Sequence, residues 1–225
     1  MRIDDLQFEG LVLCQDEKGY PFTSDSVLLA NYVKFMPGSK VVEFCSGSGV
    51  ISVLLSKKQR PSVIYGFEIM KEPFDLFKKS VEMNKLENVV FPMNEKLEDS
   101  ANILGVGFAD VVVCNPPYLE TRDEKIEKTI KNVATTEILT NLESVVESAS
   151  KLLKYGGKFY MVHRADRLVD VLCTLRKFKL EPKKLNIIYP KENFEPVVFL
   201  VEAHSGGKKG LRISKATFSN EMNKA

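Results

Sequence analysis

Cysteine and histidine are scarce in this sequence, which has four cysteines and two histidines among 225 residues. The cysteines form no close pair along the chain of the kind that clamps zinc or defines a disulfide framework, so we expect reduced thiols that are mostly buried. No set of carboxylates and histidines has the spacing of a metal site, and His163 is expected to be a core or rim residue. The sequence therefore predicts a protein without a metal ion. The four cysteines are Cys14, Cys45, Cys114 and Cys173.

Long apolar runs are also missing, because no stretch approaches the roughly 18 consecutive apolar residues that cross a bilayer. The first residues lack the apolar core of a signal peptide, and no internal repeat is visible. With 44% hydrophobic and 28% charged residues, the composition is that of an ordinary globular protein. These features exclude a disordered, collagen-like or repetitive chain. We expect a cytoplasmic protein with a single domain.

The net charge is small, but the charges are unevenly distributed along the chain. The formal net charge is +2, from 32 Lys and Arg against 30 Asp and Glu. Residues 1–150 contain 16 basic and 23 acidic residues, whereas residues 151–225 contain 16 basic and 7 acidic residues. The basic C-terminal part can face a polyanion, or its lysines can simply solvate the surface, and charge counting leaves both open.

Short apolar runs alternate with longer amphipathic stretches, which indicates a parallel sheet covered by helices. The last two strands are separated by too few residues for a helical crossover, so we expect them to be antiparallel neighbours. The sequence therefore predicts an α/β fold with a seven-stranded, mostly parallel sheet and helices on both faces. Strands are expected over 41–45, 63–67, 89–91, 109–114, 158–163, 185–189 and 197–201, and helices over 25–36, 50–58, from Pro73 onward, 138–153 (ended by Gly156 and Gly157) and 168–178.

Two segments lie outside this pattern of strands and helices. Residues 1–37 precede the first strand and are expected to form an N-terminal extension, with the main domain over residues 38–225. Residues 119–136 are polar, charged and weakly periodic. They are compatible with a loop over an active-site edge and equally with a plain surface linker.

A glycine-containing turn, residues 46–49, follows the first strand of the sheet and opens a helix. Its glycines allow the backbone to come close to a small bound molecule, although a purely structural turn has the same composition. The three-glycine pattern of dinucleotide-binding folds is incomplete, because Cys45 stands at its first position and Ile51 or Ser52 at its third. A dinucleotide is therefore disfavoured.

Acidic residues stand near the ends of the first two strands of the sheet. Glu68 follows the second strand, where a carboxylate can accept hydrogen bonds from both hydroxyls of a ribose; the alternative is an exposed strand-end acid. No Lys or Arg nearby is placed to bind a pyrophosphate, so the implied ligand has a ribose but little phosphate. S-adenosylmethionine fits this description, and Glu43 lies near where its cationic end would sit.

The most informative string is the end of the fourth strand, where Asn115, Pro116, Pro117 and Tyr118 follow an apolar run. Two successive prolines hold a rigid, extended bend. The Asn115 side-chain oxygen and the Pro116 carbonyl can each accept one N–H of a planar amine, while Tyr118 offers a stacking face. Prolines that merely terminate a strand are the alternative. We interpret the string as a clamp for an NH₂ group.

In order and spacing, residues 38–203 resemble the class I S-adenosylmethionine-dependent methyltransferases, in the amino-methylating branch marked by Asn/Asp-Pro-Pro-Tyr. The resemblance implies a Rossmann-like fold, S-adenosyl-L-methionine as cofactor, and catalytic roles for Asn115, Pro116, Pro117 and Tyr118. The glycine turn would hold the methionine part, Glu68 the ribose, and Asn94 or Glu95 the adenine, under a cover formed by the N-terminal extension. Cys45 departs from the usual first glycine of the turn. The residues expected at the cofactor are Phe22, Thr23, Asp25, Glu43, Cys45, Gly47, Gly49, Glu68, Asn94, Glu95 and Asn115.

A narrower likeness covers nearly the whole chain, through residues 2–6, 19–23, 25–30, 153–159, 162–164, 201–203 and 206–209. In these segments the sequence is similar to the bacterial tRNA adenine-N6 methyltransferases that act next to the anticodon of a valine tRNA. It departs from them before Glu137, where Thr135 and Thr136 replace the usual Arg or His. The resemblance implies tRNA as the partner, held by the basic C-terminal part; the residues expected to contact RNA are Arg164, Lys191, Lys208 and Lys209.

Other functions remain open on the sequence alone. A methyltransferase acting on a release-factor glutamine would present the same NH₂ group to the same clamp, and guanine-N2 methylation of ribosomal RNA is a third option. From a different class, a non-catalytic RNA-binding module can retain the sheet, although the complete Asn-Pro-Pro-Tyr string argues against it. The oligomeric state is not indicated.

Overall fold

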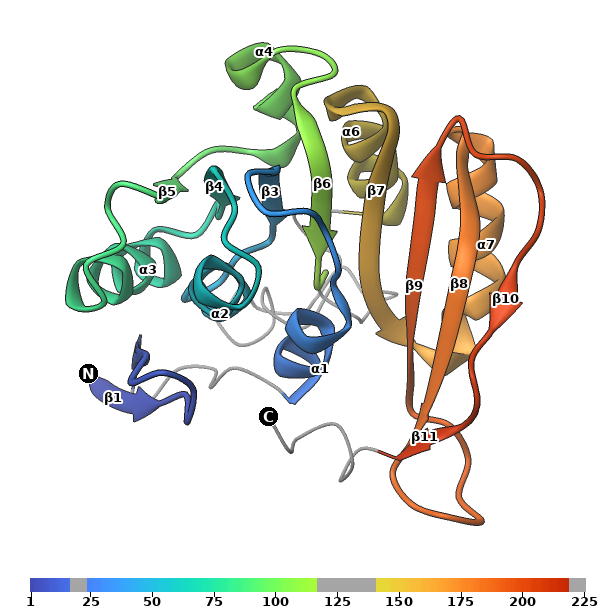
Figure 1. The fold of residues 1–225 in the computed structure, drawn as a ribbon, viewed down its shortest axis with the longest axis horizontal. Helices are drawn as coiled ribbons and strands as arrows, with labels where there is room; N and C mark the ends of the chain where they lie inside the picture. Colours follow the sequence, from blue (N-terminus) through green and yellow to red (C-terminus); the bar gives the residue numbers. More distant parts are fainter. Residues whose placement is uncertain (17–23, 117–140, 219–225) are drawn as a thin grey trace, which may run out of the picture.

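The computed structural model describes residues 1–16, 24–116 and 141–218, and its centre is a twisted, mostly parallel sheet (Figure 1). Strand β9 is antiparallel to both of its neighbours, whereas the preceding strands are parallel to one another. The seven predicted strands and the antiparallel closing pair are confirmed. In sheet order they are β5 (Val90–Met93), β4 (Val63–Phe67), β3 (Lys40–Phe44), β6 (Ala109–Cys114), β7 (Leu153–Arg164), β9 (Val198–Ser205) and β8 (Leu180–Tyr189), and the two-residue strands β10 (Arg212–Ile213) and β11 (Thr217–Phe218) both pair with β8.

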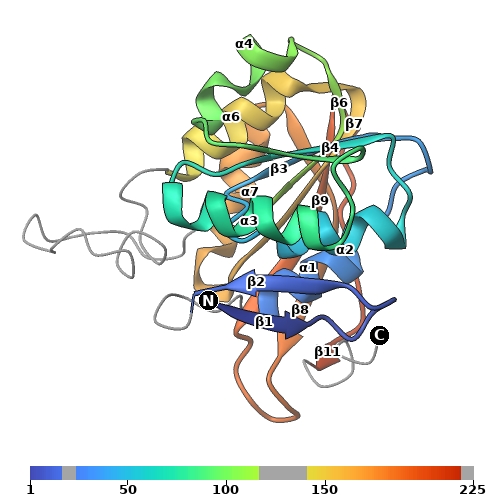
Figure 2. The ribbon, with the colours of Figure 1, turned by 90° about the vertical axis from the view of Figure 1, so that its left-hand side faces the viewer.

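Helices cover both faces of the sheet, as Figure 2 shows from the side. Alternate strand residues face opposite layers: Val41 and Val111 pack into one apolar cluster, Val42 and Val112 into the other. This burial on both faces explains the continuous apolar runs of the central strands and confirms the Rossmann-like fold. The first layer contains α1 (Ser24–Tyr32), α2 (Val50–Lys58) and α3 (Lys71–Met83); the second contains α4 (Ser100–Leu104), α6 (Leu142–Leu152) and α7 (Leu168–Lys177), with the short 3₁₀ turns η1 (Leu97–Asp99) and η2 (Ala165–Arg167).

The N-terminal residues form a hairpin that the sequence did not predict, β1 (Arg2–Asp5) with β2 (Val12–Gln15). The hairpin lies along α3 (Figure 2) and is held by side chains of that helix. Ser80 Oγ accepts the N–H of Cys14 at 2.9 Å, and the Asn84 amide exchanges two hydrogen bonds with the backbone of Val12, at 2.9 and 2.7 Å. The division of the chain at residues 37 and 38 stays a prediction.

The end of the long helix was placed wrongly by the sequence pattern. Helix α6 ends at Leu152, and β7 begins at Leu153, so Gly156 and Gly157 lie inside a strand instead of stopping a helix. The β6–β7 register shifts at this point, between Ala109 and Val111, and Gly156 adopts a φ of 78°. The glycines therefore serve an irregular strand start. Helix α1 also ends earlier than predicted, at Tyr32.

The four cysteines differ in how exposed they are. All four cysteines are free; Cys14 and Cys114 are buried and Cys45 is half-buried, whereas Cys173 is exposed on α7 and is the exception to the expected burial. Within the described ranges no helix is long and apolar enough to span a membrane. The cytoplasmic location stays a prediction.

A close packing contact between β4 and α3 leads to a stability prediction. A Cβ at Gly66 would overlap the fully buried ring of Phe77 and approach Ser46 Oγ to 2.8 Å. We expect Gly66→Ala to lower the free energy of unfolding by about 1–3 kcal/mol through overpacking. Because Phe77→Leu shortens the obstructing side chain, the double variant is expected to be less destabilised than the sum of the two single variants. Urea unfolding of the four proteins measures this coupling, and additive losses would contradict it.

Candidate active site

The carboxyl ends of the four parallel strands β3 to β6 meet at one edge of the sheet, toward which the arrow of β6 points down in Figure 1. The strand registers align Phe44 of β3 with Phe67 of β4 and Cys114 of β6, and Phe67 with Met93 of β5. The residues that follow these strands are therefore neighbours, and crevices at such an edge are where open α/β sheets bind ligands. Most of the predicted site residues are brought together here: Cys45, Gly47, Gly49, Glu68, Asn94, Glu95, Asn115 and Pro116.

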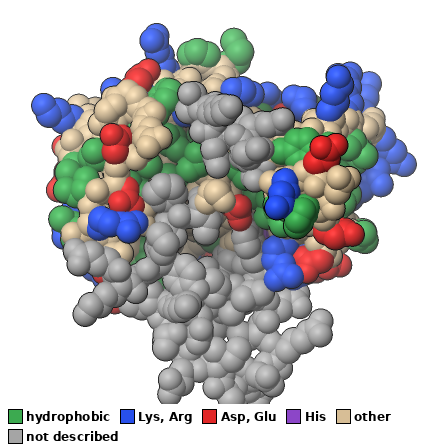
Figure 3. All heavy atoms as spheres, turned by 90° about the horizontal axis from the view of Figure 1, so that it is seen from below, with side chains coloured by type: hydrophobic (Ala, Val, Ile, Leu, Met, Phe, Trp, Pro, Cys, Tyr) green, Lys and Arg blue, Asp and Glu red, His purple; other side chains and the backbone are tan. Residues whose placement is uncertain are grey.

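Part of the predicted site cannot be placed. Phe22, Thr23, Pro117 and Tyr118 lie outside the described residues. Asp25 is half-buried in the first turn of α1, Asn115 is half-buried and Pro116 is buried. Figure 3 looks onto this edge, with basic, acidic and apolar side chains over its described surface.

The glycine turn after β3 has the backbone conformation that its glycines suggested. Gly47 and Gly49 have φ values of 55° and 87°, in the left-handed region. A Cβ at Gly49 would overlap the ring of Phe77, whereas a Cβ at Gly47 would meet no atom within 4 Å. Cys45 also adopts a left-handed φ, 56°, at a cost of roughly 1–2 kcal/mol for a residue with a side chain. The cysteine thus occupies the glycine-like conformation that its position requires.

Glu68 fixes the glycine turn to the next loop. Its two carboxylate oxygens accept the backbone N–H groups of Gly47 and Met70, both at 2.8 Å. Only 7% of the residue is exposed, which rules out the alternative of an exposed strand-end acid. Burial raises the pKa of Glu68, and the backbone hydrogen bonds partly oppose this shift. Asn94 holds the same loop, since its Nδ2 donates to the carbonyl of Glu68 at 2.9 Å; Glu95 is exposed.

Glu43 is directed toward helix α2. It is 1% exposed, and its Oε2 accepts hydrogen bonds from both the backbone N–H (3.0 Å) and the hydroxyl of Ser52. Burial, the largest cause, raises the pKa of Glu43 from 4.5 to about 8, against the opposing effect of the Ser52 hydrogen bonds. A nearby cation would favour the ionised form. The predicted contact with the cationic end of a cofactor stays a prediction.

Asn115 is held by a partner that the sequence analysis did not identify. Its Nδ2 donates to Ser26 Oγ at 2.8 Å, and Ser26 is 8% exposed in α1. With the nitrogen directed at Ser26, the amide presents its acceptor oxygen on the other side of the group. Ser26 lies in the 25–30 segment that carried the narrower resemblance, and this was the sequence signal that could have identified it.

Cys114, which precedes Asn115, is fully buried. Burial raises the pKa of its thiol, and a hydrogen bond with the Cys45 thiol raises it further. The spacing of the cysteines in the sequence did not show that these two are neighbours.

The four residues predicted to contact RNA are divided between two edges of the sheet, and only Arg164 and Lys191 lie at the carboxyl edge. Arg164 ends β7 and pairs with Asp166 (Nε–Oδ1 3.1 Å), and Lys191 follows β8 with its Nζ 4.5 Å from the ring centroid of Phe194. Because β9 runs antiparallel, the chain leaves it at the amino edge of the sheet. Lys208 and Lys209 therefore lie at the opposite end.

His163 and the described acidic residues form no metal site. His163 is fully buried, with its ring stacked on Phe199, and burial lowers its pKa to about 4. This confirms the expectation of a core residue. Over the described part of the chain, no group of three or more His, Cys, Asp or Glu side chains is placed to hold a metal ion. That the protein needs no metal stays a prediction.

The environment of Glu43 predicts how stability depends on pH. The carboxyl has a pKa of about 8 in the fold and an ordinary value of 4.5, so its stabilising effect is complete below pH 4.5 and is lost as the pH rises through 8. We expect the free energy of unfolding to fall between pH 5 and pH 9, by up to a few kcal/mol. Glu43→Gln should flatten this profile, and Glu95→Gln, an exposed control, should leave it unchanged. Parallel wild-type and Glu43→Gln profiles would refute the assignment.

Comparisons with known proteins agree with this geometry. A curated relative, the tRNA1(Val) (adenine(37)-N6)-methyltransferase of Phocaeicola vulgatus, is 21% identical over 193 residues, covering 84% of this chain and 79% of that protein. The release factor glutamine methyltransferase of Thermodesulfovibrio yellowstonii is 24% identical over 132 residues, 55% of this chain, which spans only 46% of that protein. Among solved structures, M. jannaschii TYW2 in complex with AdoMet aligns with a TM-score of 0.61 and 15% identity, over 88% of this chain and 84% of that one.

A family model gives the most direct assignment. The model described as "Methyltransferase small domain" matches residues 22–178. The matched region contains the glycine turn, Glu68 and Asn115, which are the residues that the strand registers bring to the carboxyl edge. The resemblance to the class I S-adenosylmethionine-dependent methyltransferases, with the cofactor that it implies, is therefore confirmed, and the chain belongs to the methyltransferase small domain family.

Proposed function

We propose that this protein transfers a methyl group from S-adenosyl-L-methionine to the exocyclic N6 of an adenine in tRNA, the adenine 3′ of the anticodon in a valine tRNA. The observation that carries the proposal is the Asn115 amide, oriented by Ser26 at the edge of the sheet that also contains the glycine turn. The tRNA-modifying relative supports the choice of substrate, since it matches over 84% of this chain.

The residues at the carboxyl edge fit the cofactor. The open space at Gly47 admits a ligand against the backbone, and the buried Glu43 can become ionised beside a cationic group. Glu68 accepts backbone N–H groups of Gly47, Met70 and Ile69, and a carboxylate with about four acceptor sites keeps capacity for a ribose hydroxyl. When bound, S-adenosyl-L-methionine supplies an electrophilic methyl group. We assign the methionine part to Cys45, Gly47 and Gly49, the adenine to Asn94 or Glu95, and the cover to residues 1–37 through Phe22, Thr23 and Asp25.

Asn115 and Pro116 would act on the amine that receives the methyl group. The lone pair of an exocyclic adenine nitrogen is delocalised into the ring, which makes it a poor nucleophile. Hydrogen bonds from the amine to the Asn115 oxygen and the Pro116 carbonyl favour the pyramidal nitrogen, whose lone pair is localised. Positioning of this kind can contribute roughly 7–11 kcal/mol of the barrier. The proton can leave after transfer, so the site needs no strong base.

The target base must leave its neighbours in the RNA to reach Asn115. Unstacking costs a few kcal/mol and least in a loop, which suits an anticodon loop. We assign Tyr118 as the stacking surface and Pro117 as the second rigid residue of the bend. Arg164 and Lys191 would contact phosphates near this edge, so affinity should fall as salt rises.

A glutamine side chain of a release factor is the second candidate substrate, favoured by the relative from Thermodesulfovibrio yellowstonii. The two substrates are separated by incubating the protein with labelled S-adenosyl-L-methionine and, in turn, bulk tRNA, ribosomal RNA and release factor. We expect label in tRNA only, with N6-methyladenosine mapped by mass spectrometry to the position after the anticodon. Label in the release factor, or N2-methylguanosine in RNA, would replace the proposal. A protein without affinity for the cofactor in calorimetry would be a non-catalytic module.

Removal of the Asn115 amide tests the clamp directly. We expect Asn115→Ala to lower kcat roughly 100-fold or more, the magnitude typical of losing a positioned hydrogen-bonding group, with a much smaller loss of cofactor affinity because Asn115 is also expected at the cofactor. Single-turnover methylation and calorimetry measure the two effects separately. Retained turnover in this variant would contradict the clamp.

Ser26 is expected to act as a positioning residue for Asn115. Ser26→Ala removes one neutral hydrogen bond, worth about 0.5–1.5 kcal/mol, so we expect kcat to fall roughly 2- to 12-fold. The KM for RNA and the affinity for cofactor should stay the same, because Ser26 is not assigned to either ligand. Ser24→Ala, on the exposed start of the same helix, is the control. Equal kcat values for the two variants would disprove this role.

A further inference from the structure

A line of basic side chains runs along the free edge of the sheet, away from the site described above. The segment after β9 contains Lys208, Lys209, Arg212 and Lys215, which we call the edge strip. All four are exposed, and residues 203–218 contain no acidic residue. Figure 3 shows a group of basic side chains at its right-hand rim, on the side of β8, β10 and β11.

The edge strip connects the two ends of the sheet. Strand β10 pairs in parallel with the middle of β8 through Arg212, and β11 pairs with the end of β8 through Phe218. Strand β8 has 10 residues, so at about 3.3 Å per residue the path is roughly 30 Å long. It begins at Lys208, on the amino edge, and ends beside the carboxyl edge, where Lys191 follows β8. The strip therefore extends from Lys208 and Lys209 along β8 toward Lys191, at the carboxyl edge.

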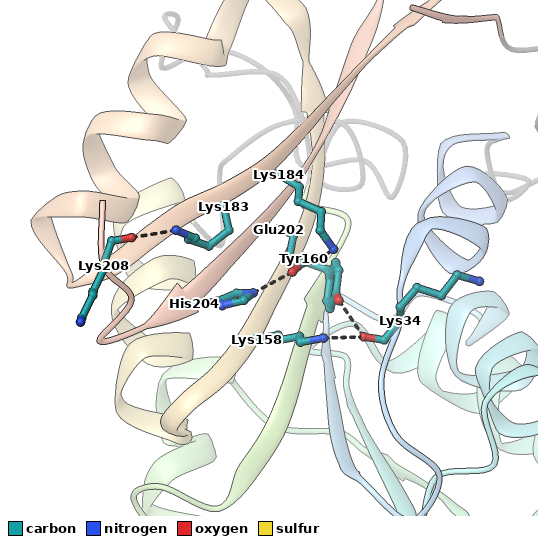
Figure 4. A network of polar contacts seen from close by, with 8 residues as sticks. All are labelled: Lys34, Lys158, Tyr160, Lys183, Lys184, Glu202, His204 and Lys208. Carbon is teal, nitrogen blue, oxygen red and sulfur yellow. Dashed lines mark hydrogen bonds and ion pairs between the residues drawn. The ribbon is translucent and has the colours of Figure 1, made fainter. Parts of the chain in front are cut away.

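The backbone of this segment is fixed to the sheet, while its charged side chains point outward. Lys183 Nζ donates to the carbonyl of Lys208 at 2.8 Å, and the N–H of Ser214 donates to the carbonyl of Leu185 at 2.8 Å. Figure 4 shows the first of these bonds, with the Lys208 side chain pointing away from Lys183. The strip is thus preorganised, which lowers the entropic cost of binding.

The acid of β9, which β8 separates from the edge strip, does not neutralise the strip. Glu202, whose side chain is 4% exposed, is already engaged by Lys184 Nζ at 2.9 Å and His204 Nε2 at 2.7 Å (Figure 4). Burial alone raises the pKa of Glu202, but the hydrogen bonds from His204 and Lys184 more than offset this, and the pKa is lowered. Among the described residues, no carboxylate forms an ion pair with any of the four strip side chains.

An exposed aromatic residue stands at the amino-edge end of the strip. Tyr155 is 88% exposed, and its ring lies so close to Gly206 that a Cβ there would overlap it. Tyr155 lines a hollow of about 420 Å³ together with Lys158, Lys154 and Asp110, and the carboxylate of Asp110 pairs with Lys154. An aromatic face beside lysines is the combination on which nucleic-acid bases stack.

We propose that the edge strip and Tyr155 bind the tRNA outside the methylated loop, the strip through the phosphate backbone and Tyr155 through a base. This inference rests on the proposed function. Four cations in line, without carboxylate partners among the described residues, favour a polyanion, and continuity with the carboxyl edge favours the RNA already engaged at Asn115.

Matched charge reversals test the proposal in the full-length protein. The variants are Lys208→Glu with Lys209→Glu and Arg212→Glu with Lys215→Glu. The control is Lys78→Glu with Lys79→Glu, an exposed adjacent pair on α3 with the same charge change. Fluorescence anisotropy measures the Kd of each protein for full-length valine tRNA and for its anticodon hairpin with a five-base-pair stem, as a function of salt. That A-form stem rises by less than the roughly 3.4 Å per step of DNA, so it extends less than about 17 Å and does not reach the far end of the strip.

We expect each strip variant to weaken binding of full-length tRNA at least tenfold and to reduce the salt slope by about one per lysine or arginine that contacts a phosphate. Hairpin binding should be unchanged in the Lys208/Lys209 variant, as should cofactor affinity, and the control should bind like the wild type. Losses no larger than those of the control, or equal losses for hairpin and tRNA, would overturn the proposal. Wild-type protein that neither binds nor methylates tRNA would instead show that the proposed function itself is wrong.

Further measurements test Tyr155 and distinguish RNA binding from two other roles of the strip charges. Tyr155→Ala should weaken tRNA binding about fivefold or more, and Tyr155→Phe should not, because the ring is kept.

Charged residues on edge strands also prevent sheets from pairing with one another, and glutamate preserves that protection. Unchanged RNA affinity in the strip variants would therefore assign the charges to edge protection alone. Loss of binding to phosphatidylserine vesicles without loss of RNA affinity would assign them to a membrane surface, and it would equally refute the proposal.

Discussion

The parallel pairing of β3 with both β4 and β6 is the constraint on which the site depends. Through it, Phe44 is level with Phe67 on one side and with Cys114 on the other. The glycine turn, Glu68 and Asn115 come from three distant parts of the sequence and meet because their strands end together. Side chains within the turns then refine the arrangement, but they do not create it. The helices on both faces fix the registers by burying the alternating apolar residues of each strand.

The two acids at this edge show how a residue can serve the fold and a ligand together. Glu68 ties the glycine turn to the loop after β4, and Glu43 ties β3 to the start of α2. Both are buried and both have a raised pKa, although more backbone hydrogen bonds oppose the upward pKa shift of Glu68 than that of Glu43. A cationic, ribose-containing ligand would thus meet carboxyl groups that are already oriented by the backbone. Such preorganisation reduces the rearrangement that binding requires.

The sequence predicted the seven sheet strands and the edge at which the site lies, because apolar runs of this kind are specified locally. It did not predict the β1–β2 hairpin, whose four-residue strands are held by Ser80 and Asn84 of a distant helix. Gly156 and Gly157 were misread because a glycine pair looks the same at a helix end and at an irregular strand start. Ser26 and the Cys45–Cys114 contact were missed since both depend on tertiary proximity. The separation of Lys208 from Arg164 follows from one reversed strand, which charge counting does not register.

Helix α3 connects the glycine turn with the N-terminal hairpin. Its inward-facing Phe77 fills the space left by Gly49 and Gly66, while Ser80 and Asn84, one and two turns further along, bind the hairpin. Helix α3 therefore contacts the glycine turn through its middle and the N-terminal hairpin through its C-terminal end. Anything that displaces the first fifteen residues, such as a fused tag or a deletion, would strip two polar groups on that helix of their partners. The loss of these hydrogen bonds would affect the glycine turn through the packed side chains of α3, without direct contact between the N-terminal residues and the turn.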